Sequence, residues 1–368
     1  MRPRLGVHSP PPALAGLAHL NGIHIIEVKH VVEWAYRAGV RLPSIPLRLQ
    51  IKQFIALAVL TALEAIRQPI CLLLTTTGIV FVTLMPVLIM HTMGEAQKVI
   101  QDSALAFQFV CGLLLGGYAA SAALGHEIRH GTVASILSKP VGRELFFLAK
   151  FCGVTLLLLL YALGMTVATL LSARMTTDAY QLDWWVGVPL FVAPAVTFAL
   201  AGLINYYTRR PFVSNAFGLL ILAMVIIFVA TGFVDAQGNV VPWGTMVPWR
   251  ILPAIVLVTM AIIILAAVAV ALTTRLETVP TLAVCSVLFL LGLMSDYLLG
   301  RHVAQSKLAA VAYGLIPNWQ HFWVVDALTN EGAIPWSYVL QTGVYAAFYL
   351  SGVLGLGILA FRRIEIKV

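Results

Sequence analysis

Eight long apolar runs dominate this chain, and each is long enough to cross a lipid bilayer. A helix needs about 20 mainly apolar residues to span the hydrocarbon core. Because lipid offers no hydrogen-bond partners to backbone groups, these runs are expected to be helices rather than open strands. Only 10% of the 368 residues are charged, against about 25% in soluble domains. The sequence therefore predicts an all-α polytopic membrane protein. The runs are 71–91, 104–125, 147–171, 185–207, 212–233, 251–273, 281–299 and 338–361.

The sixth and seventh runs are separated only by residues 274–280. This short polar link permits either two full spans or a tight hairpin, in which case six or seven complete spans remain.

Positive charge is distributed unevenly between the runs and predicts their orientation. Lys and Arg concentrate in alternate segments, which is the pattern of cytoplasmic segments in membrane proteins, and both termini are then cytoplasmic. Every tryptophan except Trp34 falls at a predicted outer boundary, where an indole is stable at the headgroup level. The net charge of +8 thus reflects contact with the lipid bilayer, and no nucleic-acid partner is expected. The basic residues predicted outside are Lys98, Arg174, Arg250, Arg301 and Lys307.

Residues 1–50 are expected to form a cytoplasmic N-terminal extension. Consecutive prolines from Pro10 interrupt what would be the apolar part of a signal peptide. Residues 24–39 place apolar side chains at near-helical spacing among charged ones, which predicts an amphipathic helix lying on the inner membrane surface.

Residues 51–368 are expected to form the transmembrane domain, and it begins with a short apolar stretch. Phe54–Leu63 is too short to cross the bilayer. Residues 51–67, which end in Glu64 and Arg67, therefore predict an interfacial elbow helix; the alternative is an overlong first span bent at Pro69.

The polar segment 125–144 contains a pattern of metal-binding residues. His126, Glu127 and His130 match H-E-x-x-H, in which two imidazoles one helical turn apart hold a zinc ion and the glutamate acts as general base. A catalytic zinc needs a third protein ligand, and no recognisable ligand motif supplies one. Gly131 would also weaken the helix that presents both histidines.

The same segment also predicts a short amphipathic helix below the membrane, in a loop spanning residues 126–146. Thr132 is suited to cap a new helix after Gly131, and Lys139-Pro140 ends it. Its apolar side chains share one face at helical spacing, and an apolar face in water usually has a partner. The alternative is a basic loop that rests on lipid headgroups. The residues of the apolar face are Val133, Ile136 and Leu137.

Together these motifs resemble the permease subunits of type 2 ABC exporters. In that family a glutamate, Gly-Thr, Leu-x-x-Pro, an arginine and a lysine follow one another between the second and third membrane helices. Six spans is the usual count in that family, so the hairpin around Arg275 looks like an addition, and in this the chain resembles the branch linked to multicopper-enzyme maturation. The matching residues here are Glu127, Arg129, Gly131, Thr132, Ile136, Leu137, Lys139, Pro140, Arg143 and Lys150, with Glu64, Arg67, Pro86 and the tail 361–365.

The resemblance implies that residues 132–139 form a coupling helix, which fits a groove on a separate cytoplasmic ATPase. ATP and magnesium would act on that partner, and this chain would bind no cofactor. It lacks the G-x-x-x-x-G-K-[ST] motif that cradles ATP phosphates. A second permease copy, identical or different, would complete the exporter in a bacterial inner membrane. Glu127 would be a structural or coupling carboxylate, paired with Arg129 or Arg143.

Two other functions remain open on the sequence. One is an intramembrane zinc protease that uses His126, Glu127 and His130. The other is a membrane assembly factor without transport of its own. The sequence does not indicate the substrate in any of these cases.

Three further features carry weaker predictions. Small residues recur at helical spacing in the second run and predict close helix packing, either within the chain or between two copies. The tryptophan-rich outer segments 232–249 and 300–336 are candidates to meet a periplasmic partner, or to anchor the chain at the membrane surface. Asp296 near the outer end of the seventh run either has a function or reaches the interface. The small residues are Gly112, Gly116, Gly117 and Ser121.

Overall fold

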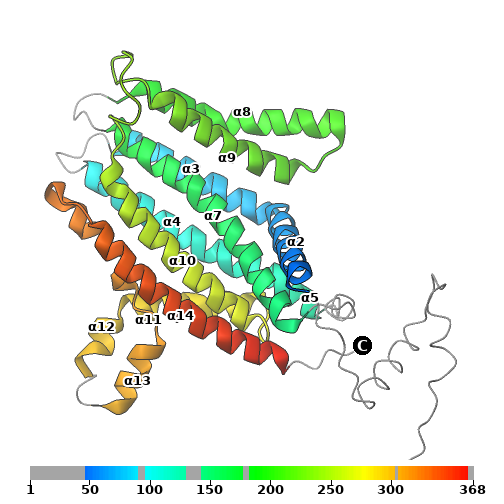
Figure 1. Ribbon diagram of the computed structural model, residues 1–368. Helices are drawn as coiled ribbons and strands as arrows, with labels where there is room; N and C mark the ends of the chain where they lie inside the picture. Colours follow the sequence, from blue (N-terminus) through cyan, green and yellow to red (C-terminus); the bar gives the residue numbers. More distant parts are fainter. Residues whose placement is uncertain (1–45, 90–95, 130–141, 177–181, 303–305, 364–368) are drawn as a thin grey trace, which may run out of the picture. The chain divides into compact units, whose positions relative to one another are not determined.

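The computed structural model describes residues 46–89, 96–129, 142–176, 182–302 and 306–363. The chain divides into two compact units, Met1–Leu49 and Gln50–Val368, and nearly all described residues belong to the second. Those residues confirm an all-α polytopic membrane protein (Figure 1). Its helices are α2 (Leu47–Ile66), α3 (Pro69–Leu88), α4 (Ala96–Ala120), α5 (His126–Arg129), α7 (Arg143–Met175), α8 (Trp184–Thr208), α9 (Phe212–Thr231), α10 (Leu252–Leu272), α11 (Thr278–Leu293), α12 (Ser295–Leu298), α13 (Lys307–Leu315) and α14 (Trp336–Arg362).

Among the described residues, eight helices are long and apolar enough to cross a membrane, but they are not the eight predicted runs. Leu47–Ile66 is one of the eight helices although it was not among the predicted runs, because the helix extends well beyond the apolar stretch 54–63. The predicted seventh span is broken instead: α11 ends at Leu293, and Ser295–His302 continues at an angle of 67°. The sixth run is a full helix, α10.

The core of the bundle is built around α4, α7 and α10. In the most apolar 18-residue window of each helix, the buried share is 67% in α7 and 61% in α10, but 17% in α14. Glycines allow the close approach of α4 to α10. A Cβ at Gly112 would lie 2.5 Å from a side-chain carbon of Ile262, and one at Gly116 would lie 3.3 Å from Ala266.

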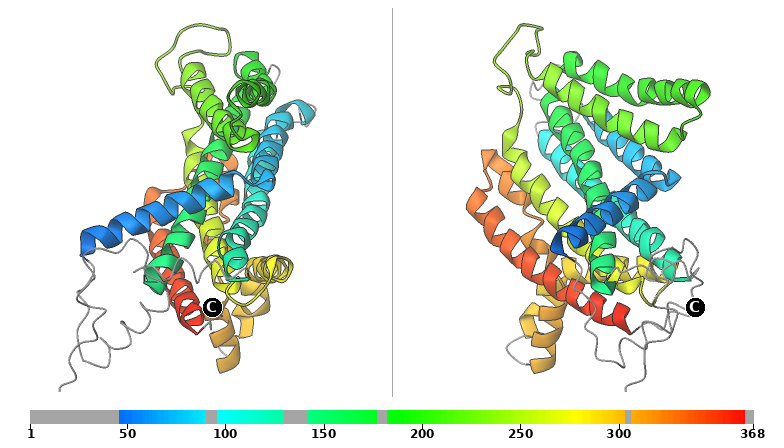
Figure 2. Two further views of the ribbon diagram at one scale, coloured as in Figure 1. Left: turned by 90° about the vertical axis from the view of Figure 1, so that its right-hand side faces the viewer. Right: turned by 45° about the vertical axis from the view of Figure 1, so that its right-hand side comes forward.

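Helix α2 runs in a different direction from the others. Both views in Figure 2 show it crossing α7 steeply near one end of the bundle. Gly153 makes this crossing possible, because a Cβ there would lie 2.5 Å from Thr61 and 2.6 Å from the carbonyl oxygen of Ala58. Such an orientation suits an elbow, and Pro69 at the first position of α3 favours a fresh helix start directly after it.

Helices α8 and α9 form a hairpin beside α3 and α7 (Figure 1). Asp183 caps α8 by accepting a hydrogen bond from the Trp185 amide. The hairpin turns at Arg209, which has a positive φ of 55°.

Candidate functional site

Most of the predicted coupling helix lies outside the described residues. This applies to Gly131, Thr132, Val133, Ile136, Leu137, Lys139 and Pro140, and also to His130. The structure does describe both flanks of this segment. Glu127 and Arg129 lie in α5 on one side, and Arg143 opens α7 on the other.

A buried lysine holds the first flank. Lys150 of α7 is 2% exposed, and its Nζ donates a hydrogen bond of 2.7 Å to Glu127 Oε1. The same Nζ lies 3.9 Å from Glu64 Oε2 on α2 and 5.6 Å from the centre of the Phe146 ring. A buried charge is costly without a partner, so this lysine ties α5, α7 and α2 together.

The predicted partner of Glu127 was Arg129 or Arg143, whereas the described contact is with Lys150, and the guanidinium of Arg129 lies beside Gly125. Reasoning from the sequence named Lys150 as part of a motif but missed its role. The available signal was a lysine inside an otherwise apolar span.

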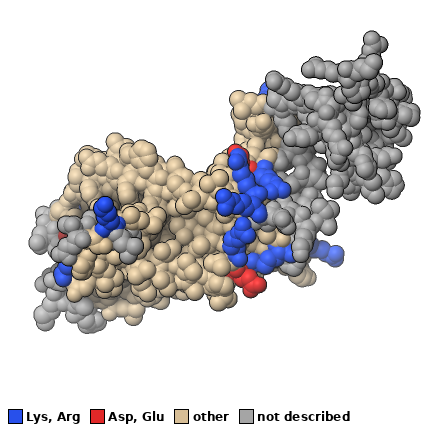
Figure 3. Space-filling view, turned by 90° about the horizontal axis from the view of Figure 1, so that it is seen from below, with Lys and Arg blue, Asp and Glu red and all other residues tan. Residues whose placement is uncertain are grey.

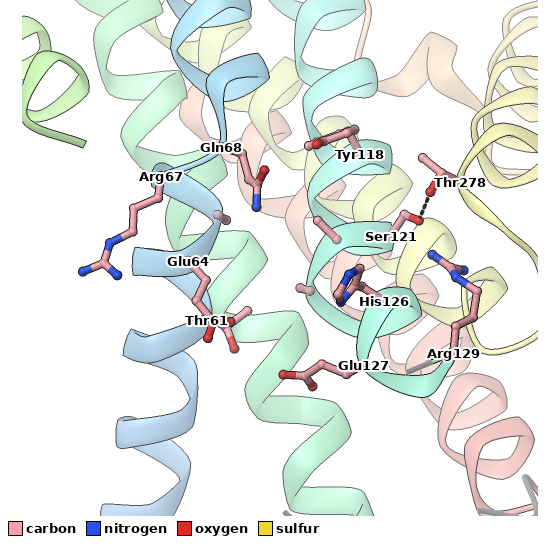
Figure 4. Close-up of a pocket in the computed structure, with 13 residues that line it drawn as sticks. Thr61, Glu64, Arg67, Gln68, Tyr118, Ser121, His126, Glu127, Arg129 and Thr278 are labelled. Carbon is pink, nitrogen blue, oxygen red and sulfur yellow. Dashed lines mark hydrogen bonds between the residues drawn. The ribbon is translucent and has the colours of Figure 1, made fainter. Parts of the chain in front are cut away.

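A polar cavity of about 680 Å³ opens beside this ion pair. It is lined from α2, α4, α5 and the start of α11 (Figure 4). His126 lies on its wall, while Glu127 points towards α7 and Arg129 points to the opposite side. A π-helical turn, Ser121–Gly125, connects α4 to α5, and Ser121 shares a hydrogen bond of 2.5 Å with Thr278 of α11. Such turns are frequent at functional sites.

A second set of contacts holds the other flank. Arg362 of α14 forms an ion pair with Glu144, and the Arg143 guanidinium donates a 3.0 Å hydrogen bond to the Arg362 carbonyl oxygen. Phe361 stacks on Phe146. Lysine and arginine side chains gather in a band on this face, as Figure 3 shows. The start of α7 is therefore fastened to the end of α14.

The H-E-x-x-H residues are not arranged as a zinc site in the part of the chain that can be described. His130 lies outside that part, and no three His, Cys, Asp or Glu side chains within it converge as metal ligands. Glu127 is engaged by an ammonium group at 2.7 Å, which disfavours its use as a general base.

The small residues of α4 pack inside the chain. Gly112 and Gly116 face α10, and a Cβ at Gly117 would lie 2.5 Å from Leu282 of α11. Ser121 bonds the same helix through Thr278.

A buried ion pair that the sequence did not suggest lies at the other end of α7. Arg174 is 1% exposed, and its Nε and Nη2 donate hydrogen bonds of 3.1 and 3.0 Å to Asp183 Oδ2. Its Nη1 donates to the Thr231 carbonyl oxygen at 2.6 Å. Because these partners lie at the start of α8 and the end of α9, one guanidinium fixes three helix ends.

Asp296 also has partners that explain its place in the chain. Its Oδ1 accepts hydrogen bonds from Tyr313 at 2.7 Å and from Asn318 at 2.8 Å. The backbone amide of Asn318 reaches Tyr345 of α14 at 3.4 Å. The network thus secures the broken segment after α11 to the last helix.

Comparison with protein-family models, with curated proteins and with solved structures gives no match. The functional interpretation therefore rests on the geometry. The chain is a polytopic membrane protein, and side-chain contacts hold the residues on both sides of the segment 130–141.

Proposed function

We propose that this chain is the membrane-spanning subunit of an ATP-binding cassette exporter. The observation that carries the proposal is the fastening of both flanks of the segment 130–141. Glu127 is bonded to Lys150, and Arg143 and Glu144 are bonded to Arg362. A segment meant to receive force from a partner needs such attachments, because a loosely held loop would move without moving the membrane helices.

The charge network defines the route of that force. A displacement of α5 acts on Lys150, which is buried in α7 and also close to Glu64 of α2. An ion pair in a medium of low dielectric constant resists separation more strongly than one in water. Motion of the segment 130–141 would thus be transmitted mainly to α7, and more weakly to the elbow helix, because Glu64 is 49% exposed and 3.9 Å from Lys150.

The partner in this proposal is a cytoplasmic ATPase that binds ATP and magnesium. The amphipathic face predicted at Val133, Ile136 and Leu137 would dock on it. A second permease copy would complete the transport path, with the substrate class left open.

The test is co-purification of the detergent-solubilised chain with the ATPase encoded nearest to it. Ile136→Glu should lose the ATPase, because a carboxylate replaces the apolar contact. Val279→Glu is the matched control: it places the same charge at an exposed apolar residue, 77% exposed, at the start of α11. The double variant His126→Ala, His130→Ala should retain the ATPase.

Two results would overturn the proposal. If Val279→Glu releases the ATPase as fully as Ile136→Glu, the docking face has been misassigned. If no ATPase binds, and the wild type carries stoichiometric zinc that the double histidine variant lacks, the chain is a metalloenzyme.

A further inference from the structure

The turn of the α8–α9 hairpin contains an arginine in a backbone conformation that favours glycine. Arg209 has a φ of 55°, and among the described residues it is the only non-glycine with a positive φ. It follows the last turn of α8, a position where glycine or asparagine is usual. Residues in this backbone region are enriched at functional sites. The turn holds the conformation, because the Arg209 amide donates to the Asn205 carbonyl oxygen and the Asn205 side chain donates to the Arg210 carbonyl oxygen at 2.6 Å.

The surroundings of this turn are basic and aromatic. Arg209 and Arg210 are both exposed, and no carboxylate in the described part of the chain lies within 4 Å of either guanidinium. Tyr206 and Tyr207 precede them, 79% and 78% exposed, with ring centres 5.2 Å apart. Guanidinium groups recognise phosphate, and tyrosine is stable at the headgroup level of a bilayer.

An apolar groove lies further along the same hairpin, away from the turn and towards the other ends of α8 and α9. It has a volume of about 300 Å³ and runs along α8 from Pro189 to Leu200. At 1.5 Å per residue this is about 16 Å of helix, and the turn lies about 14 Å further on. Leu222 and Ile226 of α9 form the other wall, 54% and 57% exposed. Gly218 continues their stripe towards the turn, with open space where a Cβ would be.

From these features we infer that the hairpin binds one phospholipid with an anionic headgroup. The phosphate would contact Arg209 and Arg210, and one acyl chain would occupy the groove. Two features favour a lipid over a protein partner. The groove is lined by apolar residues of α8 and α9, two helices long and apolar enough to cross a membrane, and both arginines lie at the end of the hairpin that the charge pattern predicts to be cytoplasmic. This inference does not depend on the proposed function.

The test measures lipid binding to the purified, delipidated full-length chain by native mass spectrometry. The probe is palmitoyl-oleoyl phosphatidylglycerol, compared with the zwitterionic phosphatidylcholine of the same chains and with glycerol phosphate. The wild type should bind phosphatidylglycerol at least about tenfold more tightly than either. Phosphatidylcholine keeps the phosphate but adds a choline cation that the arginines repel, and glycerol phosphate lacks the acyl chains.

Arg209→Gly is the decisive variant, because lipid affinity and fold stability should change in opposite directions. Affinity for phosphatidylglycerol should fall about tenfold. The melting temperature in detergent should not fall, since glycine adopts a positive φ without strain. Arg275→Gln, which removes an exposed arginine between α10 and α11, should leave binding unchanged.

A groove variant tests the second half of the site. Ala223→Phe fills the groove and should weaken binding of the long-chain lipid, while leaving a dioctanoyl lipid with the same headgroup less affected. The inference is overturned if Arg209→Gly binds like the wild type, if Arg275→Gln loses binding equally, or if phosphatidylcholine binds as tightly. Equal binding of glycerol phosphate would show a phosphate site that does not use the groove, and would overturn the lipid assignment.

Discussion

Replacing Lys150 with methionine should destabilise the protein more than replacing Glu64, the more distant of its two carboxylate partners. Methionine keeps most of the length and apolar stem of lysine but removes the ammonium group. The carboxylate of Glu127, 18% exposed, would then lose its 2.7 Å donor.

The magnitude follows from this burial. Removing one partner of a fully buried pair costs about 3–5 kcal/mol. Because Glu127 retains some access to water, we expect about 2–3 kcal/mol for Lys150→Met. Glu64 is 49% exposed and lies 3.9 Å from Lys150, so Glu64→Gln should cost less than about 1 kcal/mol.

The assay is the free energy of unfolding measured by steric trapping in bicelles, which needs no denaturant. A double-mutant cycle of Lys150→Met with Glu127→Gln should give a coupling energy of about 1–2 kcal/mol. The reasoning is refuted if Glu64→Gln is as damaging as Lys150→Met, or if the coupling energy is zero.

Two other predictions use the same assay at other sites. Arg174→Met should cost about 3–5 kcal/mol, because it leaves the buried Asp183 carboxylate without its guanidinium. A loss of stability below about 1 kcal/mol would mean that water replaces the pair. Arg250→Met, at a half-buried arginine, is the control. Gly153→Leu should displace α2, since even a Cβ there would meet Thr61 and Ala58, and the expected loss of stability is about 1–3 kcal/mol. Gly202→Leu, with open space around the glycine, is the control. Equal losses in the two variants would contradict the close crossing of α2 and α7.

The sequence predicted those parts of the fold that depend on local hydrophobicity. The run 212–233 became α9, Phe212–Thr231, because a continuous apolar stretch needs no distant partner to be helical in lipid. The break after α11 was not predictable in this way. It depends on Trp319, which packs against Gly292 and donates its indole N–H to the Leu288 carbonyl oxygen, from a position distant in sequence.

The same distinction applies to the candidate site. Glu64, Glu127 and Arg143 were named as candidates from local motifs in the sequence. The partner of Glu127 lies 23 residues away on another helix, so only the packing of α5 on α7 identifies Lys150. The Arg174–Asp183 pair was missed because Arg174 was assigned to an outer segment from the distribution of positive charge, which says nothing of burial. Burial of a charge is a property of the fold, and composition does not reveal it.

The broken segment after α11 has a consequence for how the protein is made. Two of its hydrogen bonds need residues of α14, which are synthesised later: the Asn318 amide donates to the Tyr345 hydroxyl, and the Tyr349 hydroxyl donates to the Leu315 carbonyl oxygen. Ribosomal synthesis therefore delivers α11–α13 to the membrane before α14, their clasp, exists. During that interval these two contacts cannot form, so the segment is held by its bonds to residues already synthesised, such as those of Asp296 and of Trp319.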